Sequence, residues 1–208
     1  MHLFLIRHGE TDWNTERRIQ GRTDTRLNAR GIEQAEKLAA RLAAEEKIEV
    51  LYSSPQQRAR VTAEIIAQKA GVEATLDARL IEKHLGVYEG KSFEEIEASD
   101  PGLARMWRES KEEFLLPGEE PPADLQKRVR EFLDEIAPQH NGARVAVVSH
   151  GGTINMLVST LLELDINRRW PFWFDNASVS YVDLSGPRAR LRLLNDTCHL
   201  RNGYHDHS

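Results

Sequence analysis

The stretch LIRHGETDWN, residues 5–14, determines how the rest of the chain is interpreted. It begins inside a mostly apolar run, 2–6, that is too short for a helix and has the apolar density of a strand covered on both faces. Arg7 and His8 would then emerge at the carboxyl end of a buried strand, just ahead of Gly9. Open α/β sheets bind ligands at this edge, so we expect Arg7 and His8 to face a site.

The composition is that of a mildly acidic globular chain. The 208 residues suit a single domain, residues 1–208, and carry a formal net charge of −5. No lysine or arginine cluster favours a nucleic acid or an anionic membrane as partner. Cys198 is the only cysteine, which excludes an internal disulfide and a cysteine-based metal site. No apolar run is long enough for a signal peptide or a membrane span, so we expect a cytoplasmic protein.

Three apolar runs and two alternating runs have the pattern of strands. They lie at 2–6, 48–52, 144–148, 177–184 and 188–194. The first three are apolar along most of their length, as strands of a parallel sheet covered on both faces are. The last two alternate and are joined by a Ser-Gly-Pro turn, which predicts an antiparallel pair.

Helical patterns fill the intervals between these strands. Asn28 is expected to cap one helix, and Ser54 with Pro55 to begin a second. Further helices are expected over 121–140 and 153–164. Strands that alternate with helices predict an α/β fold, a three-layer sandwich whose central sheet is mostly parallel and has helices on both faces.

Residues 89–124 interrupt this alternation and are expected to form a helical lid insertion within the domain. Ser92 and Glu95 have the spacing of a capping box ahead of one of its helices. The segment contains eleven acidic and four basic side chains, a net charge of −7. A segment with this charge is a poor cradle for a substrate that carries several anionic groups.

Three strand-to-helix junctions carry residues that bind anions. Arg7 and His8 follow the first strand, Arg58 follows the second, and His150 with Gly151 follows the third. Because parallel strands end at the same edge of a sheet, we expect these side chains to gather around one point. A helix that begins near Gly151 adds free N–H groups and partial positive charge. The junctions therefore predict an anion site.

Phosphate is the anion that these residues fit best. Guanidinium groups bind its oxygens in a fork, and a neutral imidazole can attack phosphorus. A metal held by His8 and His150 is disfavoured, because Arg7 would repel a cation and no carboxylate adjoins either histidine in sequence. The stretch 85–92 is no Walker loop, since three residues separate its glycines where four are required. We expect neither a metal nor a cofactor.

The stretch LIRHGETDWN resembles the signature of the histidine phosphatase superfamily, which includes the phosphoglycerate mutase-like proteins. The similarity continues through 27–42, 51–66, 80–96 and 145–157, so it spans nearly the whole chain in the family's order. This resemblance implies a metal-independent phosphatase that hydrolyses small phosphomonoesters. The expected partner is a small phosphorylated metabolite.

The resemblance also implies roles for residues of this sequence. His8 would be the nucleophile that becomes phosphorylated, and Glu82 would protonate the leaving oxygen and then activate water. Arg7, Arg58 and His150 would complete the catalytic set. The substrate phosphate would be bound by Arg7, Asn14, Gln20, Arg58, His150 and Gly151.

Two other functions stay open at this point. The resembled family contains mutases, so one alternative is a phosphoglycerate mutase, although the acidic lid favours hydrolysis. The other is a non-catalytic protein that binds a phosphorylated ligand. The ending LNDTCHL, 194–200, is similar to those of phosphoserine phosphatases and of phosphatases for α-ribazole phosphate or of broad specificity. It does not choose among phosphoserine, α-ribazole phosphate, a sugar phosphate or a broad range of substrates.

The aromatic cluster WPFWF, Trp170–Phe174, has three interpretations. It can belong to the core, to the wall of the substrate pocket or to a subunit interface. The last interpretation would make the protein a homodimer.

Overall fold

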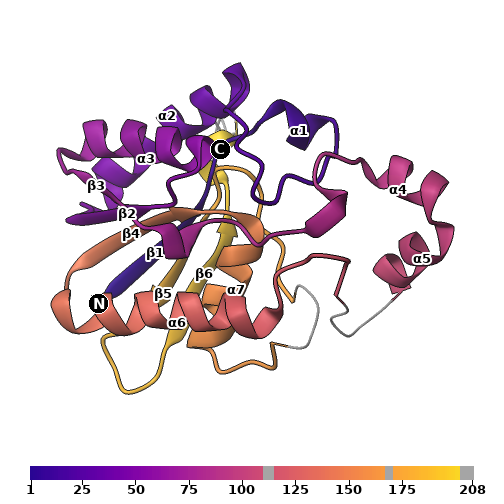
Figure 1. Cartoon of the computed structure of the whole chain (residues 1–208). Helices are drawn as coiled ribbons and strands as arrows, with labels where there is room; N and C mark the ends of the chain where they lie inside the picture. Colours follow the sequence, from indigo (N-terminus) through magenta and orange to yellow (C-terminus); the bar gives the residue numbers. More distant parts are fainter. Residues whose placement is uncertain (110–114, 167–170, 202–208) are drawn as a thin grey trace, which may run out of the picture.

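The computed structural model describes residues 1–109, 115–166 and 171–201. A six-stranded sheet lies at its centre in the order β3-β2-β4-β1-β5-β6 (Figure 1). The strands are β1 (His2–Arg7), β2 (Val50–Ser53), β3 (Ala74–Leu76), β4 (Arg144–Ser149), β5 (Val179–Asp183) and β6 (Arg190–Asp196). Strands β1 to β4 are parallel, whereas β5 is antiparallel to both β1 and β6. The mostly parallel sheet and the antiparallel pair were both predicted; the short strand β3 was not.

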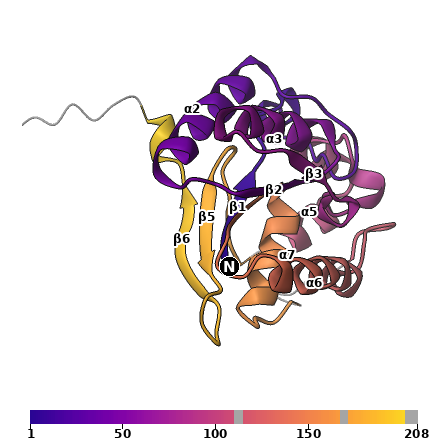
Figure 2. The ribbon, with the colours of Figure 1, turned by 90° about the vertical axis from the view of Figure 1, so that its left-hand side faces the viewer.

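Helices cover both faces of the sheet, as Figures 1 and 2 show. One layer consists of α2 (Ala29–Glu45) and α3 (Gln57–Ala70), and the other of α6 (Pro122–Gln139) and α7 (Gly151–Leu161). Successive residues of β1 serve the two layers in turn: Phe4 and Ile6 pack with α2 and α3, whereas Leu3 and Leu5 pack with α6 and α7. The predicted three-layer α/β sandwich is confirmed. No helix in the described residues is both long and apolar enough to cross a membrane.

The second helix begins two residues later than predicted. The helix α3 begins at Gln57, and Ser54 and Pro55 lie in the connection before it. Oγ of Ser54 accepts from the N–H of Gln56 at 3.3 Å and lies 2.8 Å from Nε2 of His150. This hydroxyl therefore holds the turn before α3 and the ring of His150 rather than the first turn of a helix, yet Arg58 still falls in the first turn of α3.

The amino terminus of α2 packs directly on the loop that follows β1. Asn28 caps this helix as predicted, its Oδ1 accepting from the N–H of Gly31 at 2.8 Å. A Cβ atom on Gly31 would collide with the carbonyl group of Glu10, and one on Gly9 with that of Gly31. Both positions need glycine because the two backbones touch, and this contact supports the loop next to His8.

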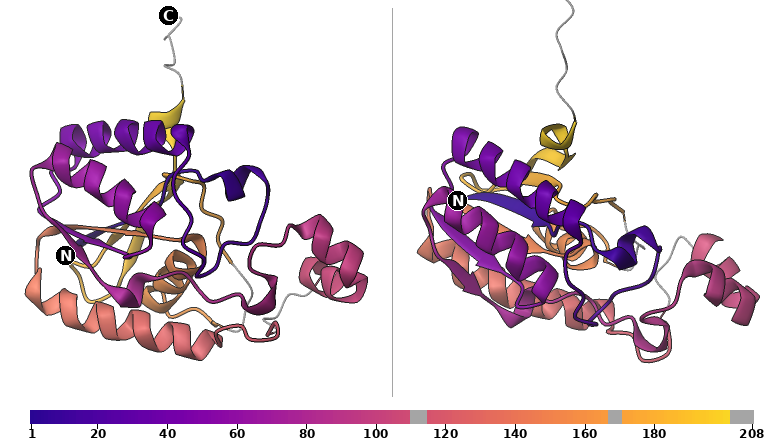
Figure 3. Two further views of the ribbon diagram at one scale, coloured as in Figure 1. Left: turned by 45° about the horizontal axis from the view of Figure 1, so that its top comes forward. Right: turned by 90° about the horizontal axis from the view of Figure 1, so that it is seen from above.

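Between β3 and α6 the chain leaves the sandwich. Two short 3₁₀ helices, η1 (Ala78–Leu80) and η2 (Gly86–Tyr88), precede α4 (Phe93–Ser99) and α5 (Pro101–Glu109), which lie to one side of the sheet (Figures 1 and 3). Ser92 and Glu95 form the predicted capping box, with contacts of 3.2 and 2.9 Å. The part of the lid segment at 110–114 is outside the described residues.

Candidate active site

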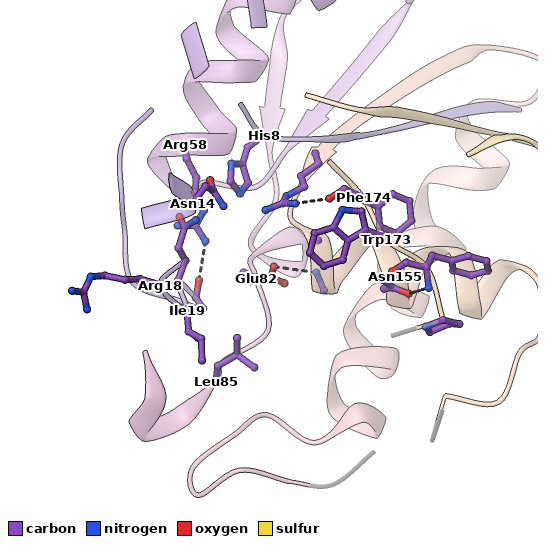
Figure 4. A pocket seen from close by; sticks show the side chains of 17 residues that line it. His8, Asn14, Arg18, Ile19, Arg58, Glu82, Leu85, Asn155, Trp173 and Phe174 are labelled. Carbon is purple, nitrogen blue, oxygen red and sulfur yellow. Dashed lines mark hydrogen bonds between the residues drawn. The ribbon is translucent and has the colours of Figure 1, made fainter. Parts of the chain in front are cut away.

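A pocket of about 690 Å³ lies at the edge of the sheet where β1 and β4 end (Figure 4). The structure brings most of the predicted site residues to its wall: Arg7, His8, Asn14, Gln20, Arg58, Glu82 and Gly151. His150 is fully buried and does not line the pocket, but the centroid of its ring is 5.2 Å from that of His8. The three junctions therefore meet at one point, with His150 beside the nucleophile candidate.

His8 is held in one tautomer by its Nδ1 atom. Nδ1 lies 2.7 Å from the carbonyl oxygen of Gly9, which can only accept, so the neutral ring carries its proton on Nδ1. Burial, followed by the positive charges of Arg58 and Arg7, holds the pKa of His8 well below its ordinary value of 6.5. The lone pair on Nε2 is therefore available at neutral pH, as a nucleophile requires.

Hydrogen bonds fix the backbone on both sides of His8. The N–H of Gly9 donates to Oγ1 of Thr62 at 3.1 Å, and that hydroxyl donates to the carbonyl of Arg58 at 2.8 Å. From the segment before β5, Nδ2 of Asn176 donates to the carbonyl of His8 at 3.1 Å. The end of β1 is thus tied to α3 on one side and to the approach to β5 on the other.

Arg58 is buried and Arg7 half-buried, and part of the hydrogen-bonding capacity of each is unused. Arg58 is only 1% exposed and donates to the carbonyl oxygens of Gly21 and Thr23, both at 2.8 Å. Arg7 donates to the carbonyl oxygen of Phe174. The Nε atoms of both arginines are buried and have no partner. A buried guanidinium held by carbonyl groups alone is costly until an anion joins it.

Both guanidinium groups remain charged at neutral pH. Burial lowers the pKa of Arg58 to about 10, although Glu82 and Asp24 act in the opposite direction. Burial also lowers the pKa of Arg7, against the effect of Glu82 and Asp175. Because guanidinium groups stay protonated in proteins at neutral pH, one end of the pocket carries two positive charges.

His150 has one ring nitrogen engaged and one unused. Its Nε2 contacts Oγ of Ser54, whereas Nδ1 is buried without a partner. Burial, followed by the charge of Arg58, holds its pKa well below 6.5. An uncharged polar atom therefore lies unpaired next to His8.

Glu82 accepts hydrogen bonds from the first turn of α7. Its Oε1 accepts from the N–H groups of Lys83 at 2.8 Å and Thr153 at 3.0 Å, and Oε2 accepts from that of Gly152 at 3.1 Å. The N–H of Glu82 itself donates to Oε1 of Gln56 at 2.7 Å. Because Oε2 has a single backbone donor, it keeps capacity for a proton that it can share with a bound molecule.

Asn14 and Gln20 lie on the loop side of the pocket. Asn14 belongs to α1 (Asp12–Thr15), and its Oδ1 accepts from both N and Oγ1 of Thr11, at 3.0 and 2.9 Å. The side-chain oxygen of Gln20 accepts from Oγ1 of Thr25 at 2.6 Å. In each amide the oxygen is engaged within the protein, which leaves the NH₂ group to face an anion.

Several residues of the pocket wall were missed by the sequence analysis. Ile19 and Leu85 come from loops, and Asn155 comes from the second turn of α7. Nδ2 of Asn155 donates to the carbonyl of Phe172 at 2.6 Å, and its Oδ1 accepts from the N–H of the same residue at 3.2 Å. In the sequence, only Asn155 could have been identified, as a polar amide within an apolar helical segment. Nothing in the sequence marked Ile19 or Leu85 as pocket residues.

The aromatic cluster is divided between the core and the pocket. Both Phe174 and Trp173 line the pocket, but Phe174 is 3% exposed and packs in the core under α6 and α7, whereas Trp173 is 74% exposed. Trp170 lies outside the described residues. The interface interpretation, and with it the homodimer, stays a prediction.

The segment before α6 is anchored beside Glu82 by ion pairs. Nζ of Lys83 lies 2.7 Å from Oε1 of Glu119, and both side chains are only 4% exposed. The carboxylate of Glu120 pairs with Arg128 at 2.8 Å. These acidic residues therefore hold the end of the lid segment against the chain that carries Glu82.

Comparison with known proteins agrees with the geometry. Residues 3–197 match the model of the histidine phosphatase superfamily (branch 1). The chain is 37% identical over 202 residues to phosphoserine phosphatase 1 of Hydrogenobacter thermophilus, covering 97% of this chain and 95% of that protein. It is 40% identical over 157 residues to phosphoglycerate mutase-like protein 4 of Arabidopsis thaliana, covering 74% and 68%. The structure of a mycobacterial glucosyl-3-phosphoglycerate phosphatase in complex with VO3 has a TM-score of 0.83 at 33% identity, covering 93% of this chain and 98% of that one.

Proposed function

Since the chain belongs to the histidine phosphatase superfamily and is a phosphatase, we propose that it hydrolyses small phosphomonoesters through a phosphohistidine on His8. The observation that carries this proposal is the environment of His8. Its Nε2 lone pair faces a site where Arg7 and Arg58 are charged and each has a buried Nε atom without a hydrogen-bond partner. A phosphoryl group supplies the missing acceptors and an electrophile for the ring at once.

In the first step the phosphoryl group is transferred to the enzyme. Its oxygens are bound by the guanidinium groups of Arg7 and Arg58, the unpaired Nδ1 of His150 and the amide of Asn14. The Nε2 lone pair of His8 forms a bond to phosphorus while the bond between phosphorus and the leaving oxygen breaks. The carboxyl group of Glu82 gives its proton to that oxygen, so an alcohol leaves and a carboxylate remains. The amide of Gln20 and the N–H of Gly151 are further donors to the phosphate.

In the second step water replaces the alcohol. The carboxylate of Glu82 takes a proton from water while the water oxygen bonds to phosphorus and the bond to Nε2 of His8 breaks. Inorganic phosphate leaves, the imidazole recovers its lone pair, and Glu82 is again protonated for the next cycle. Charge and protons balance over the cycle, because His8 and Glu82 return to their starting states and the two arginines stay protonated throughout.

Hydrolysis is favoured over isomerisation by the charge around the pocket. A mutase keeps its phosphoenzyme from water and retains a bisphosphorylated intermediate, which requires additional cationic contacts. Residues 89–124, which we propose to be a lid inserted in a single domain of residues 1–208, carry a net charge of −7. This segment is unsuited to holding a second phosphate.

The test of the proposed function is the substitution His8→Ala. Because this variant has no nucleophile, hydrolysis of p-nitrophenyl phosphate should fall by at least about 10⁴-fold, and rapid alkaline quenching should trap phosphohistidine only in the wild type. His140→Ala is the matched control, since this histidine lies at the end of α6 and contacts Tyr52 rather than the pocket. A folded and active His8→Ala variant would show that His8 is not the nucleophile.

The mutase alternative has its own measurement. With 3-phosphoglycerate and a trace of 2,3-bisphosphoglycerate, the enzyme should release inorganic phosphate with negligible formation of 2-phosphoglycerate. Rapid isomerisation with little free phosphate would contradict the assignment of hydrolysis.

A further inference from the structure

Beyond the phosphate end, the wall of the pocket is apolar and contains one unusually exposed side chain. Trp173 lies on one side of the pocket, and Ile19 and Leu85 lie on the other (Figure 4). About three quarters of the Trp173 side chain is exposed, at 74%, although large aromatic groups gain most from burial. An exposed indole at the mouth of a pocket is a surface that a bound molecule can cover.

Hydrogen bonds hold Trp173 in this position. Its Nε1 donates to Oδ1 of Asp175 at 2.9 Å, so the polar edge of the indole is satisfied within the protein. Asp175 is itself held by Asn195 of β6: Oδ2 accepts from Nδ2 of Asn195 at 2.9 Å, and the N–H of Asp175 donates to Oδ1 of Asn195 at 2.6 Å. The backbone of Asn195 has a φ of 53°, in the left-handed region that asparagine adopts more readily than most residues other than glycine. From this position its side chain orients Asp175 and, through it, the indole.

The charges at the mouth disfavour an alcohol that carries its own carboxylate. Among the lining residues that the structure describes, Arg18 is the one cation besides Arg7 and Arg58. Its guanidinium is engaged by Glu16 at 2.7 Å and Glu95 at 2.8 Å, and it extends away from His8 in Figure 4. A second anionic group on the substrate would therefore have to displace existing ion pairs.

We propose that this wall selects phosphomonoesters whose alcohol carries a flat, uncharged aromatic or heteroaromatic ring. The ring stacks on Trp173 and is covered from the opposite side by Ile19 and Leu85, while the phosphate is bound at the inner end. Trp173 is thus a specificity-determining residue, and Asp175 and Asn195 are positioning residues that act through it. The inference rests on the proposed hydrolysis at His8 and adds the substrate class.

The test compares two substrates with alcohols of similar reactivity. Both 2-phenylethyl phosphate and n-propyl phosphate release a primary alkyl alcohol, so a difference in kcat/KM reports binding of the ring rather than leaving-group chemistry. The wild type should prefer the phenylethyl ester by at least about tenfold. Trp173→Ala should reduce this preference to less than about threefold, because kcat/KM falls more for the phenylethyl ester than for the propyl ester.

Two further variants separate positioning from general damage. Asn195→Gly keeps the left-handed backbone but removes the amide that orients Asp175, so it should weaken the phenylethyl preference by about threefold while leaving the propyl rate nearly unchanged. Leu76→Ala removes another exposed apolar side chain, 48% exposed and in β3, and should leave the preference intact.

The possible results distinguish this inference from the function on which it rests. Equal kcat/KM for the two esters, an unchanged preference in Trp173→Ala, or a preference for phosphoserine or 3-phosphoglycerate would overturn the proposed substrate class while leaving hydrolysis in place. Failure to hydrolyse any phosphomonoester, with no trapped phosphohistidine, would instead overturn the proposed function and the inference with it.

Discussion

The two ends of the pocket are built from different kinds of structure. At the inner end, Arg7, His8 and Arg58 come from the end of a central strand and the first turn of a helix, and their backbones are linked through Thr62. At the outer end, the wall is formed by side chains from loops, and Trp173 is mostly exposed. The inner end has the rigidity that phosphoryl transfer needs, because a small displacement of a catalytic group is costly. Arg7 and His8 are tied to the segment that carries Trp173 through the backbone carbonyl of Phe174 and the side chain of Asn176, not through the indole, so substitutions of the indole should change selectivity more than chemistry.

Among the substitutions that test this difference between the two ends, Arg58→Ala should lower kcat/KM the most. Removing this guanidinium group, one of two at the phosphate end, should lower kcat/KM by about 10³-fold, and by a similar factor for every phosphomonoester, since all substrates share the phosphate. Arg60→Ala on the same helix removes an exposed ion pair with Glu64 and is the matched control. Losses that differed widely between substrates would show that the inner end also determines selectivity. Circular dichroism would check that both variants are folded.

Glu82→Gln should slow hydrolysis to an extent that depends on the leaving group of the substrate rather than on its shape. Esters of alkyl alcohols should slow by about 10²-fold or more, whereas p-nitrophenyl phosphate should lose less than about tenfold, because an aryl oxide leaves without a proton. Steady-state rates on both substrates give the ratio, and Glu64→Gln on the exposed face of α3 is the control. Equal losses of rate on both substrates would show that a group other than Glu82 protonates the leaving oxygen.

A smaller effect concerns stability at mildly acidic pH. His8 and His150 have folded pKa values held well below 6.5 by burial, whereas in the unfolded chain both bind a proton near 6.5. The unfolded state therefore binds more protons below this pH, and the free energy of unfolding should fall by about 1 kcal/mol per pH unit for each histidine between about pH 6.5 and 5. Urea titrations across this range measure the slope. A double variant, His8→Asn with His150→Asn, should lose it; an unchanged slope would contradict the burial of neutral rings.

The sequence predicted the inner end well for a local reason. A buried strand that stops at Arg7 and His8 places both at the edge of a parallel sheet, whatever the details of the loops. Arg58 was placed in or near the first turn of its helix even though the expected cap at Ser54 was wrong, because an error of two residues does not move a side chain to another face of the fold. Glu82 was different: it follows the short helix η1, where no periodic pattern marks it, and only the family resemblance singled it out.

The outer wall could not be predicted in the same way. The letters WPFWF show that aromatic side chains are present but not which of them are buried, and the structure buries Phe174 but leaves Trp173 exposed. The orientation of Trp173 depends on Asp175 and on Asn195 of the last strand, a contact that no spacing rule indicates. Selectivity here is a product of tertiary contacts between distant segments, whereas the catalytic end follows from single strand endings.

The central place of β1 in the sheet has a consequence for how the enzyme is made. This strand is synthesised long before its two partners, β4 (Arg144–Ser149) and β5 (Val179–Asp183). Its apolar residues therefore stay unpaired until those strands have been made, and pairings between such distant segments form slowly. We expect the apolar run of β1 to be a binding site for chaperones on the nascent chain, and phosphatase activity to appear only when β4 and β5 have joined the sheet.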